Sequence, residues 1–231
     1  MKVLSEIRNH EFHNLFWIRT KDGNTRLATI NANPGKKVYT ERLVNIQGKE
    51  YRTFDPFKSK LAASVFKKMK NFPFSEGSKI LYLGAASGTT VSHLSDIVGE
   101  KGVIYAVEFS SRSIRDLIAV SERRTNIIPI HADARFPEQY SFLVSNVDIV
   151  YEDVAQPTQA EILNVNVQSY LKSGGYFFLA VKARSIDVTK DPKIIFREVK
   201  EQLKEEGLLI SEVIDLEPFE KDHVMIVGKL L

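Results

Sequence analysis

Two patterns of apolar residues follow one another along the chain. Up to about residue 54, short apolar stretches are separated by turn signals such as Asp22-Gly23, as in β-hairpins. Beyond Asp55-Pro56, apolar runs of strand length alternate with segments whose apolar residues recur every three to four positions. Strands that alternate with helices favour an α/β fold with a mostly parallel sheet. We therefore expect an all-β subdomain over residues 1–54 and an α/β domain over residues 55–231.

The α/β part predicts its elements in a regular order. Strands are expected at residues 80–83, 102–107, 126–130, 147–151 and 176–181, with a closing hairpin at 208–216 and 224–228. Helices are expected at residues 57–69, 90–98, 113–123, 157–170 and 192–206. The closing hairpin makes the last strand antiparallel to the rest of the sheet.

The stretch at residues 79–96 predicts a ligand site. An apolar strand runs into a turn of small residues, 84–88, and helical spacing begins at Thr90. Such a turn presents backbone N–H groups at a helix N-terminus to a nucleotide-like ligand. The dinucleotide pattern needs glycine where Ala86 and Thr89 stand, and the phosphate loop needs a lysine after Gly88. A nucleoside without a polyphosphate remains, and S-adenosylmethionine is the common one.

Acidic residues follow three of the predicted strands. Glu108 stands 24 residues after Gly84, near the spacing at which a carboxylate binds both ribose hydroxyls. Asp133 and Asp153 follow the next two strands. Ligands of open α/β sheets bind outside these strand ends. The alternative for Glu108 is a charge at a helix N-terminus, and the glycine turn favours ribose binding.

Composition narrows the classes of function. The net charge is only +3, too small for binding nucleic acid by bulk charge, and the absence of cysteine excludes disulfides and thiolate metal sites. The first eight residues carry charges where a signal peptide needs an apolar core, and no apolar run could span a membrane. We expect a cytoplasmic protein without a membrane partner. A basic cluster either faces RNA or forms a solvated rim; it comprises Lys36, Lys37, Arg42, Lys49 and Arg52.

Four segments of the chain resemble fibrillarin, the RNA 2′-O-methyltransferase of box C/D guide particles. They are residues 83–93 (LGAASGTTVSH), 55–63 (DPFKSKLAA), 150–157 (VYEDVAQP) and 182–187 (KARSID). The resemblance covers essentially the whole chain and is closest to the shorter archaeal form, which has no Gly-Arg-rich tail. Phe54-Asp55 stands where the family usually shows Trp-Asn, a modest departure.

This resemblance implies a fold and a cofactor. The fold is that of a class I, Rossmann-like methyltransferase, with a seven-stranded, mostly parallel sheet, an antiparallel last strand and a small N-terminal all-β subdomain. The cofactor is S-adenosylmethionine, with Asp133 and Ala134 at its adenine. The implied cofactor residues are Gly84, Ala85, Ala86, Ser87, Gly88, Thr89, Thr90, Glu108, Phe109, Asp133, Ala134, Asp153, Val154, Ala155 and Gln156.

The resemblance also implies a catalytic set and a reaction. Lys60, Asp153, Lys182 and His223 match the Lys-Asp-Lys-His set of the family, which methylates a ribose 2′-hydroxyl in rRNA or tRNA. The protein must orient this hydroxyl and remove its proton. Two roles stay open for Lys182: a neutral general base, or a cation that steers the oxygen lone pair. Asp222 is the alternative to His223. No metal is needed.

The implied partners are those of a guide particle. They are a box C/D guide RNA, the target RNA, a Nop-domain scaffold protein and a kink-turn-binding protein. Two other classes of function are a non-catalytic particle subunit and a small-molecule O-methyltransferase. The intact Lys60, Asp153 and Lys182 argue against the first. The N-terminal β subdomain, in place of a lid or an apolar acceptor pocket, argues against the second.

Overall fold

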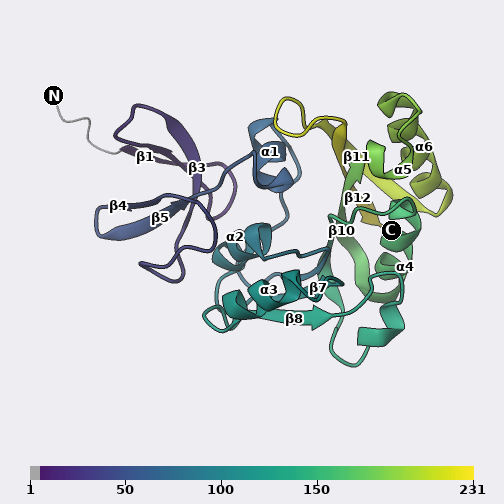
Figure 1. The fold of residues 1–231 in the computed structure, drawn as a ribbon, viewed down its shortest axis with the longest axis horizontal. Coiled ribbons are helices and arrows are strands. Elements are labelled where there is room, and N and C mark those ends of the chain that lie inside the picture. Colours follow the sequence, from purple (N-terminus) through teal and green to yellow (C-terminus); the bar gives the residue numbers. More distant parts are fainter. Residues whose placement is uncertain (1–5) are drawn as a thin grey trace.

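The computed structural model describes residues 6–231, which form two sheets lying side by side (Figure 1). The N-terminal sheet is antiparallel, with the strand order β1-β2-β3-β5-β4. Its strands are β1 (Glu6–Asn9), β2 (Phe16–Arg19), β3 (Thr25–Ile30), β4 (Leu43–Ile46) and β5 (Lys49–Thr53). The predicted all-β character is confirmed, but β1 has no counterpart among the expected strands. The N-terminal stretch considered for a signal peptide includes residues 1–5, which lie outside the described range.

The second sheet has seven strands in the order β11-β12-β10-β9-β6-β7-β8. The strands β6 to β10 run parallel, and β12 lies antiparallel between β10 and β11, which confirms the predicted sheet. The strands are β6 (Lys79–Leu83), β7 (Val103–Glu108), β8 (Ile127–His131), β9 (Val147–Glu152), β10 (Leu171–Lys182), β11 (Leu208–Asp215) and β12 (His223–Leu230).

Helices cover both faces of this sheet. On β6, Ile80 and Tyr82 face the core shared with the first three helices, whereas Leu81 and Leu83 face the core shared with α4 and α6. A strand buried on both faces reads as a continuous apolar run, as this one does. None of the helices within residues 6–231 is long and apolar enough to cross a bilayer. The helices are α1 (Lys60–Phe66), α2 (Thr89–Val98), α3 (Ser113–Ser121), the 3₁₀ turn η1 (Pro137–Tyr140), α4 (Gln159–Tyr170), α5 (Ala183–Ile186) and α6 (Pro192–Glu205).

The helix predicted at residues 57–69 is shorter than expected. It begins at Lys60 because Ser59 caps it, the Ser59 hydroxyl accepting from the N–H of Ala62 at 3.4 Å. The preceding residues form a turn in which the Asp55 carboxylate accepts from the N–H of Phe57 at 2.9 Å. Phe57, the first residue of the predicted helix, lies outside it and is 61% exposed.

A second difference concerns the start of β10. The strand is predicted to begin at residue 176, but β10 begins at Leu171, and its register with β9 shifts between Leu171 and Tyr176. The shift accommodates the extra residues as a bulge, so the strand continues through the glycines instead of beginning after them.

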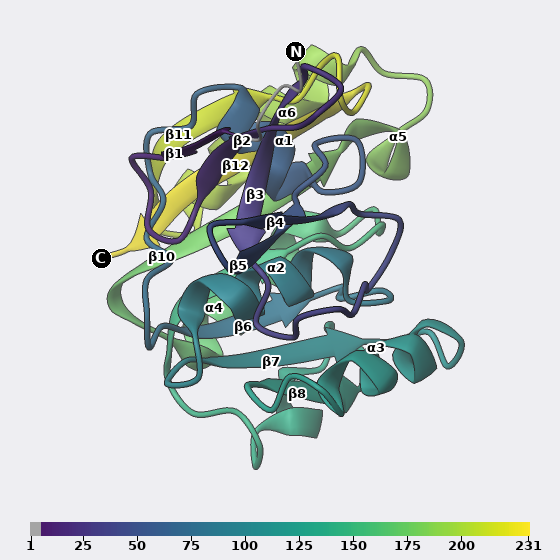
Figure 2. The same cartoon turned by 90° about the vertical axis from the view of Figure 1, so that its left-hand side faces the viewer.

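A buried cluster of charges joins the N-terminal sheet to α2, which lies directly behind it in Figure 2. On α2, one oxygen of Asp96 lies 2.5 Å from Arg124, and the other lies 3.3 Å from Arg52 of β5. Arg52 also lies 2.9 Å from Glu41. The prediction that Arg52 belongs to an exposed basic cluster is wrong, since its side chain is fully buried between these two carboxylates.

His93 adds a second contact between the N-terminal sheet and α2, nearer the N-terminus of the helix. Its ring is fully buried, stacks on Phe54 at 4.0 Å and hydrogen-bonds to Thr29 of β3 and to Tyr39 at 2.8 Å each. Burial lowers the pKa of His93 well below its ordinary value, so the ring is neutral at pH 7. Polar side chains of the N-terminal sheet thus hold the helix that begins at the glycine turn.

Replacing Asp96 with asparagine is expected to destabilise the protein strongly. The substitution removes the shared carboxylate and leaves two buried guanidinium groups, Arg52 and Arg124, facing an uncharged amide. Losing one partner of a buried ion pair lowers the free energy of unfolding by about 3–5 kcal/mol. Denaturant titration measures this loss. The control Glu205→Gln, at an exposed carboxylate of α6, should stay within about 0.5 kcal/mol of the parent; an equally small change for Asp96→Asn contradicts the structural role given to the cluster.

Candidate active site

A cavity of about 280 Å³ lies at the carboxyl ends of the parallel strands. The structure brings together there ten of the predicted cofactor residues, from the loops that follow β6, β7, β8 and β9, together with Lys182 at the end of β10. These ten are Gly84, Ala86, Glu108, Phe109, Asp133, Ala134, Asp153, Val154, Ala155 and Gln156.

The glycine turn approaches the loop after β9 very closely. A Cβ atom on Gly84 would lie 2.9 Å from the carbonyl oxygen of Asp153, and the φ of Gly84 is +80°. Both the close contact and the left-handed backbone exclude a side chain there. The turn is fixed on its other side by Ala86, whose N–H donates to Glu108 at 2.7 Å. The turn therefore forms a rigid wall of the cavity.

The acidic residues at the end of β7 and after β8, Glu108 and Asp133, are already engaged. The oxygens of Glu108 accept from the N–H groups of Ala86 and Ser110, both at 2.7 Å, so its carboxylate is held in place but keeps further lone pairs. Asp133 accepts hydrogen bonds from the backbone N–H of Arg135 at 3.0 Å and from its guanidinium at 3.0 and 2.6 Å. These hydrogen bonds lower the pKa of Asp133 and keep it charged.

At the other end of the cavity, two lysines meet one carboxylate. Oδ1 of Asp153 lies 2.8 Å from Nζ of Lys182 and 3.2 Å from Nζ of Lys60, which begins α1. The Lys182 ammonium also donates to the main-chain oxygen of Asp153 at 2.7 Å. The side chains of Lys60, Lys182 and Asp153 are only 14%, 15% and 16% exposed, so water screens this charge cluster little.

His223 lies beside the lysine cluster. It stands directly opposite Lys182 in the antiparallel pair of β10 and β12, so both side chains lie on one face of the sheet. Its Nδ1 lies 2.7 Å from the carbonyl oxygen of Lys221, so Nδ1 carries the proton of the neutral ring and Nε2 is free to accept. Burial and the charge of Lys60 lower the pKa of His223.

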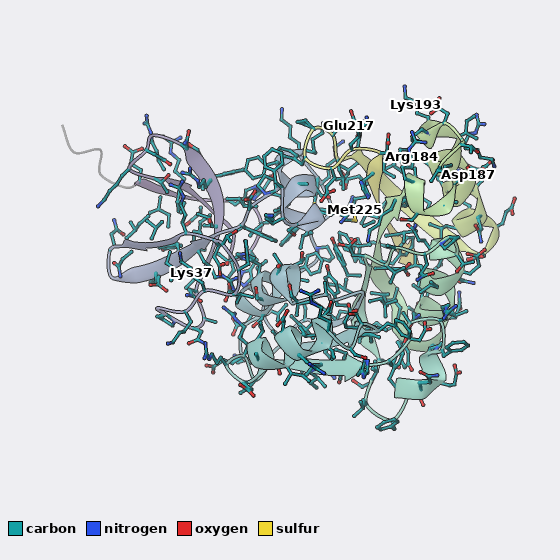
Figure 3. The ribbon with its side chains drawn as sticks, in the orientation of Figure 1. Lys37, Arg184, Asp187, Lys193, Glu217 and Met225 are labelled. Atoms are coloured by element: carbon teal, nitrogen blue, oxygen red, sulfur yellow. The ribbon has the colours of Figure 1, made fainter. Side chains whose placement is uncertain are left out.

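The neighbouring Asp222 faces away from this cluster. Its carboxylate accepts from Nε of Arg184 at 2.9 Å, and Arg184 lies on α5 (Figure 3). Of the two candidates for the fourth residue of the set, His223 therefore lies with the lysines and Asp222 does not.

Five predicted cofactor residues do not line the cavity: Ala85, Ser87, Gly88, Thr89 and Thr90. Ala85 and Thr90 are buried, and Thr90 donates to Ser59 at 2.9 Å. A Cβ atom on Gly88 would lie 3.0 Å from Leu117, so this glycine permits the approach of α3. Ser87 borders a different cavity, of about 460 Å³, between residues 33–38 and α3.

Comparison with known proteins places the chain among its relatives. The Fibrillarin family model matches residues 7–231. The chain is 53% identical to a fibrillarin-like rRNA/tRNA 2′-O-methyltransferase of Methanopyrus kandleri over 97% of each chain. The chain belongs to the fibrillarin family.

Two solved fibrillarin structures have the same fold. Fibrillarin of Aeropyrum pernix, in complex with natively bound S-adenosyl-L-methionine, superimposes with a TM-score of 0.91 at 46% identity, covering 98% of this chain and 99% of that one. The fibrillarin chain of a fibrillarin/Nop5p complex gives a TM-score of 0.85 at 38% identity, over 96% and 100% of the two chains.

Three side chains of the site were missed by the sequence analysis. Gln159 is buried at the start of α4 and binds the main chain of Lys182 twice, donating to its carbonyl at 3.3 Å and accepting from its N–H at 3.0 Å. Glu152 is fully buried, and burial raises its pKa well above the ordinary value, favouring the neutral acid. Glu220 lies 3.9 Å from Lys60. Their roles depend on distant segments, so no local pattern marks them.

We expect the His223 imidazole to titrate below its ordinary pKa of 6.5, and the substitution Lys60→Met to raise that pKa. Removing the ammonium of Lys60 eliminates one of the charges that oppose protonation, while the burial remains. NMR titration of the ring protons measures both values. Lys67→Met is the matched control at the C-terminal cap of the same helix, since the Lys67 ammonium binds the carbonyl of Glu217, in the loop above α1 in Figure 3. An unchanged His223 pKa in Lys60→Met contradicts this placement.

Proposed function

We propose that the chain transfers a methyl group from S-adenosylmethionine to a ribose 2′-hydroxyl of rRNA or tRNA within a box C/D guide particle. The observation that carries this proposal is the position of Lys182. Its side chain lines the cavity that suits the cofactor and at the same time contacts Asp153 at 2.7 and 2.8 Å. This cation therefore lies at the proposed cofactor cavity, where it can contact an acceptor hydroxyl brought beside the methyl group.

The cavity fits the chemistry of the cofactor. Gly84 lets the main chain of the turn lie directly against that of Asp153, so backbone forms this wall of the cavity, and Glu108 keeps lone pairs for the ribose hydroxyls. Phe109, 69% exposed, offers an aromatic face to the adenine beside Asp133 and Ala134. Val154, Ala155 and Gln156 complete the cavity on the side of β9. Bound S-adenosylmethionine supplies a methyl group already activated on a sulfonium.

The catalytic residues of the chain then have to orient the acceptor and release its proton. The Lys182 ammonium donates one hydrogen bond to the carbonyl oxygen of Asp153 and lies 2.8 Å from Oδ1 of the same residue, which leaves it N–H donors for a hydroxyl oxygen. We assign Lys182 to fixing the hydroxyl so that one lone pair faces the methyl group. Asp153 and Gln159 position Lys182, and Lys60 places a second positive charge beside the Asp153 carboxylate. The proton leaves to water or to Nε2 of His223.

The small net charge of the chain is the reason for proposing RNA and protein partners. A net charge of +3 is too small to bind and select an RNA by charge alone. We assign target selection to a box C/D guide RNA paired with the target RNA. A Nop-domain scaffold protein and a kink-turn-binding protein would hold the guide, and the known fibrillarin/Nop5p complex supports the scaffold.

In this proposal, residues 1–54 form a β subdomain and residues 55–231 the methyltransferase domain.

The substitution Lys182→Met tests this function. It keeps the aliphatic stem and removes the ammonium, so packing changes little. Single-turnover methyl transfer in the assembled guide particle is expected to fall by at least about 100-fold, because positioned proton transfer or charge stabilisation is lost. Equilibrium binding of S-adenosylmethionine, measured by calorimetry, should stay near the parent value.

The control for this experiment is Glu108→Ala, which should show the opposite pattern. Removing the ribose acceptor is expected to weaken cofactor binding by about 1.5–3 kcal/mol, and saturating cofactor should restore most of the transfer. Unimpaired transfer in a folded Lys182→Met protein contradicts the proposed mechanism. If the parent particle itself transfers no methyl group to RNA, the chain is a non-catalytic subunit instead.

A further inference from the structure

Helix α1, which carries Lys60 at its first position, is short and weakly capped. It spans seven residues, and the Ser59 hydroxyl that caps it lies 3.4 Å from the N–H of Ala62. The buried side of the helix, within residues 61–65, packs on the apolar core. Apolar contacts have no preferred direction, so they do not by themselves fix the rotation of a helix on its core. The placement of Lys60 therefore has to come from directional contacts near the start of α1.

One such contact joins the start of α1 to the start of α2. The hydroxyl of Thr90 donates to the hydroxyl of Ser59 at 2.9 Å, and both residues are buried, with exposures of 7% and 2%. Buried away from water, these groups depend on their protein partners. Ser59 directly precedes Lys60, and Thr90 stands two positions after Gly88, the last residue of the glycine turn. The hydrogen bond thus links the end of this turn to the backbone that carries Lys60.

Two routes therefore connect the glycine turn with the lysine. In the first, Gly84 lies against the main chain of Asp153, whose carboxylate lies 3.2 Å from the Lys60 ammonium. An ion pair of this kind holds the end of a flexible four-carbon side chain but not the backbone behind it. The second route, through Thr90 and Ser59, holds that backbone. Together the two routes fix both ends of the lysine side chain relative to the turn.

We propose that the hydrogen bond between Thr90 and Ser59 positions Lys60 relative to the glycine turn, and so sets the distance between the methyl donor and the cations on the acceptor side. The inference rests on the proposed function, because it adds two positioning residues for the same transfer. Neither residue lines the cofactor cavity, so both act through Lys60. Small displacements of a positioned group lower the rate of transfer because the reacting atoms lose their alignment.

The substitution Thr90→Val tests this role, since it keeps the shape of the side chain and removes the donor. Single-turnover transfer in the assembled guide particle, at saturating S-adenosylmethionine, is expected to fall about 2- to 12-fold, the usual contribution of one hydrogen bond. Thr90→Ser keeps the hydroxyl and should keep the parent's rate. In the background of Lys60→Met, Thr90→Val should cause no further loss, because no ammonium remains to be positioned.

Thr29→Val is the matched control. It removes another buried hydroxyl that contacts α2, at His93 and Asp96, 2.8 Å from each. Any loss of rate that it causes should be the same factor in the parent and in Lys60→Met, because the two sites share no partner.

Two results for Thr90→Val would overturn the proposal. An equal loss of rate in the parent and in Lys60→Met would show that the hydrogen bond only stabilises the packing of the two helices. Weakened cofactor binding with the parent's rate at saturating cofactor would assign Thr90 to the cofactor instead.

The pKa of His223 gives a measurement that needs no methyl transfer. Burial and the charge of Lys60 both lower this pKa. A lysine that has lost its position is better solvated, so Thr90→Val should raise the His223 pKa part of the way toward its value in Lys60→Met. Ser59→Ala removes the acceptor of the same hydrogen bond and should give a similar rise. An unchanged His223 pKa in both variants would overturn the proposal, whereas a parent particle without transfer would count against the proposed function.

Discussion

A single carboxylate, that of Asp153, holds the proposed catalytic site together. It carries the only negative charge within 3.2 Å of both Lys60 and Lys182 in the described structure, and these two ammonium groups come from α1 and β10. Without this charge, the two cations would repel each other in a poorly screened setting. The main chain of Asp153 is equally constrained: its N–H donates to Leu83 at 2.9 Å, and its carbonyl touches Gly84 and accepts from Lys182. The residue that follows β9 thus contacts both the glycine turn and the two lysines.

The N-terminal sheet acts on this site through α2. The pairs of Asp96 with Arg52 and Arg124, together with His93, fix that helix along its length, and the helix begins at the glycine turn. The position of this sheet therefore bears on the cofactor site, although the sheet supplies none of the four catalytic candidates.

Much of this arrangement follows from the sequence, for identifiable reasons. Parallel strands end at one edge of a sheet, so Gly84, Glu108, Asp133 and Asp153 could be placed together from the strand pattern alone. Lys60 could not, because local patterns place a lysine on the surface and only the resemblance to fibrillarin singled it out. Lys182 follows a predicted strand at the same edge, and this position together with the resemblance made it a candidate.

The errors have two physical causes. The burial of Arg52 depends on Glu41 and Asp96, and the clamp of Gln159 on Lys182 joins residues 23 positions apart, so these partners are set by the folded chain. The exposure of Phe57 depends on two local hydrogen bonds that compete with the helix pattern. Apolar periodicity encodes neither kind of contact.

The central claim is that the cluster of Lys60, Asp153 and Lys182 acts on a ribose 2′-hydroxyl. It is tested most directly with two target RNAs that differ only at the acceptor nucleotide, one a ribonucleotide and the other its 2′-deoxy analogue. Both are incubated with the guide particle and S-adenosylmethionine carrying a labelled methyl group. The account predicts stoichiometric label on the ribose of the first RNA and none on the second. Equal labelling of both RNAs would place the methyl group on another atom and contradict it.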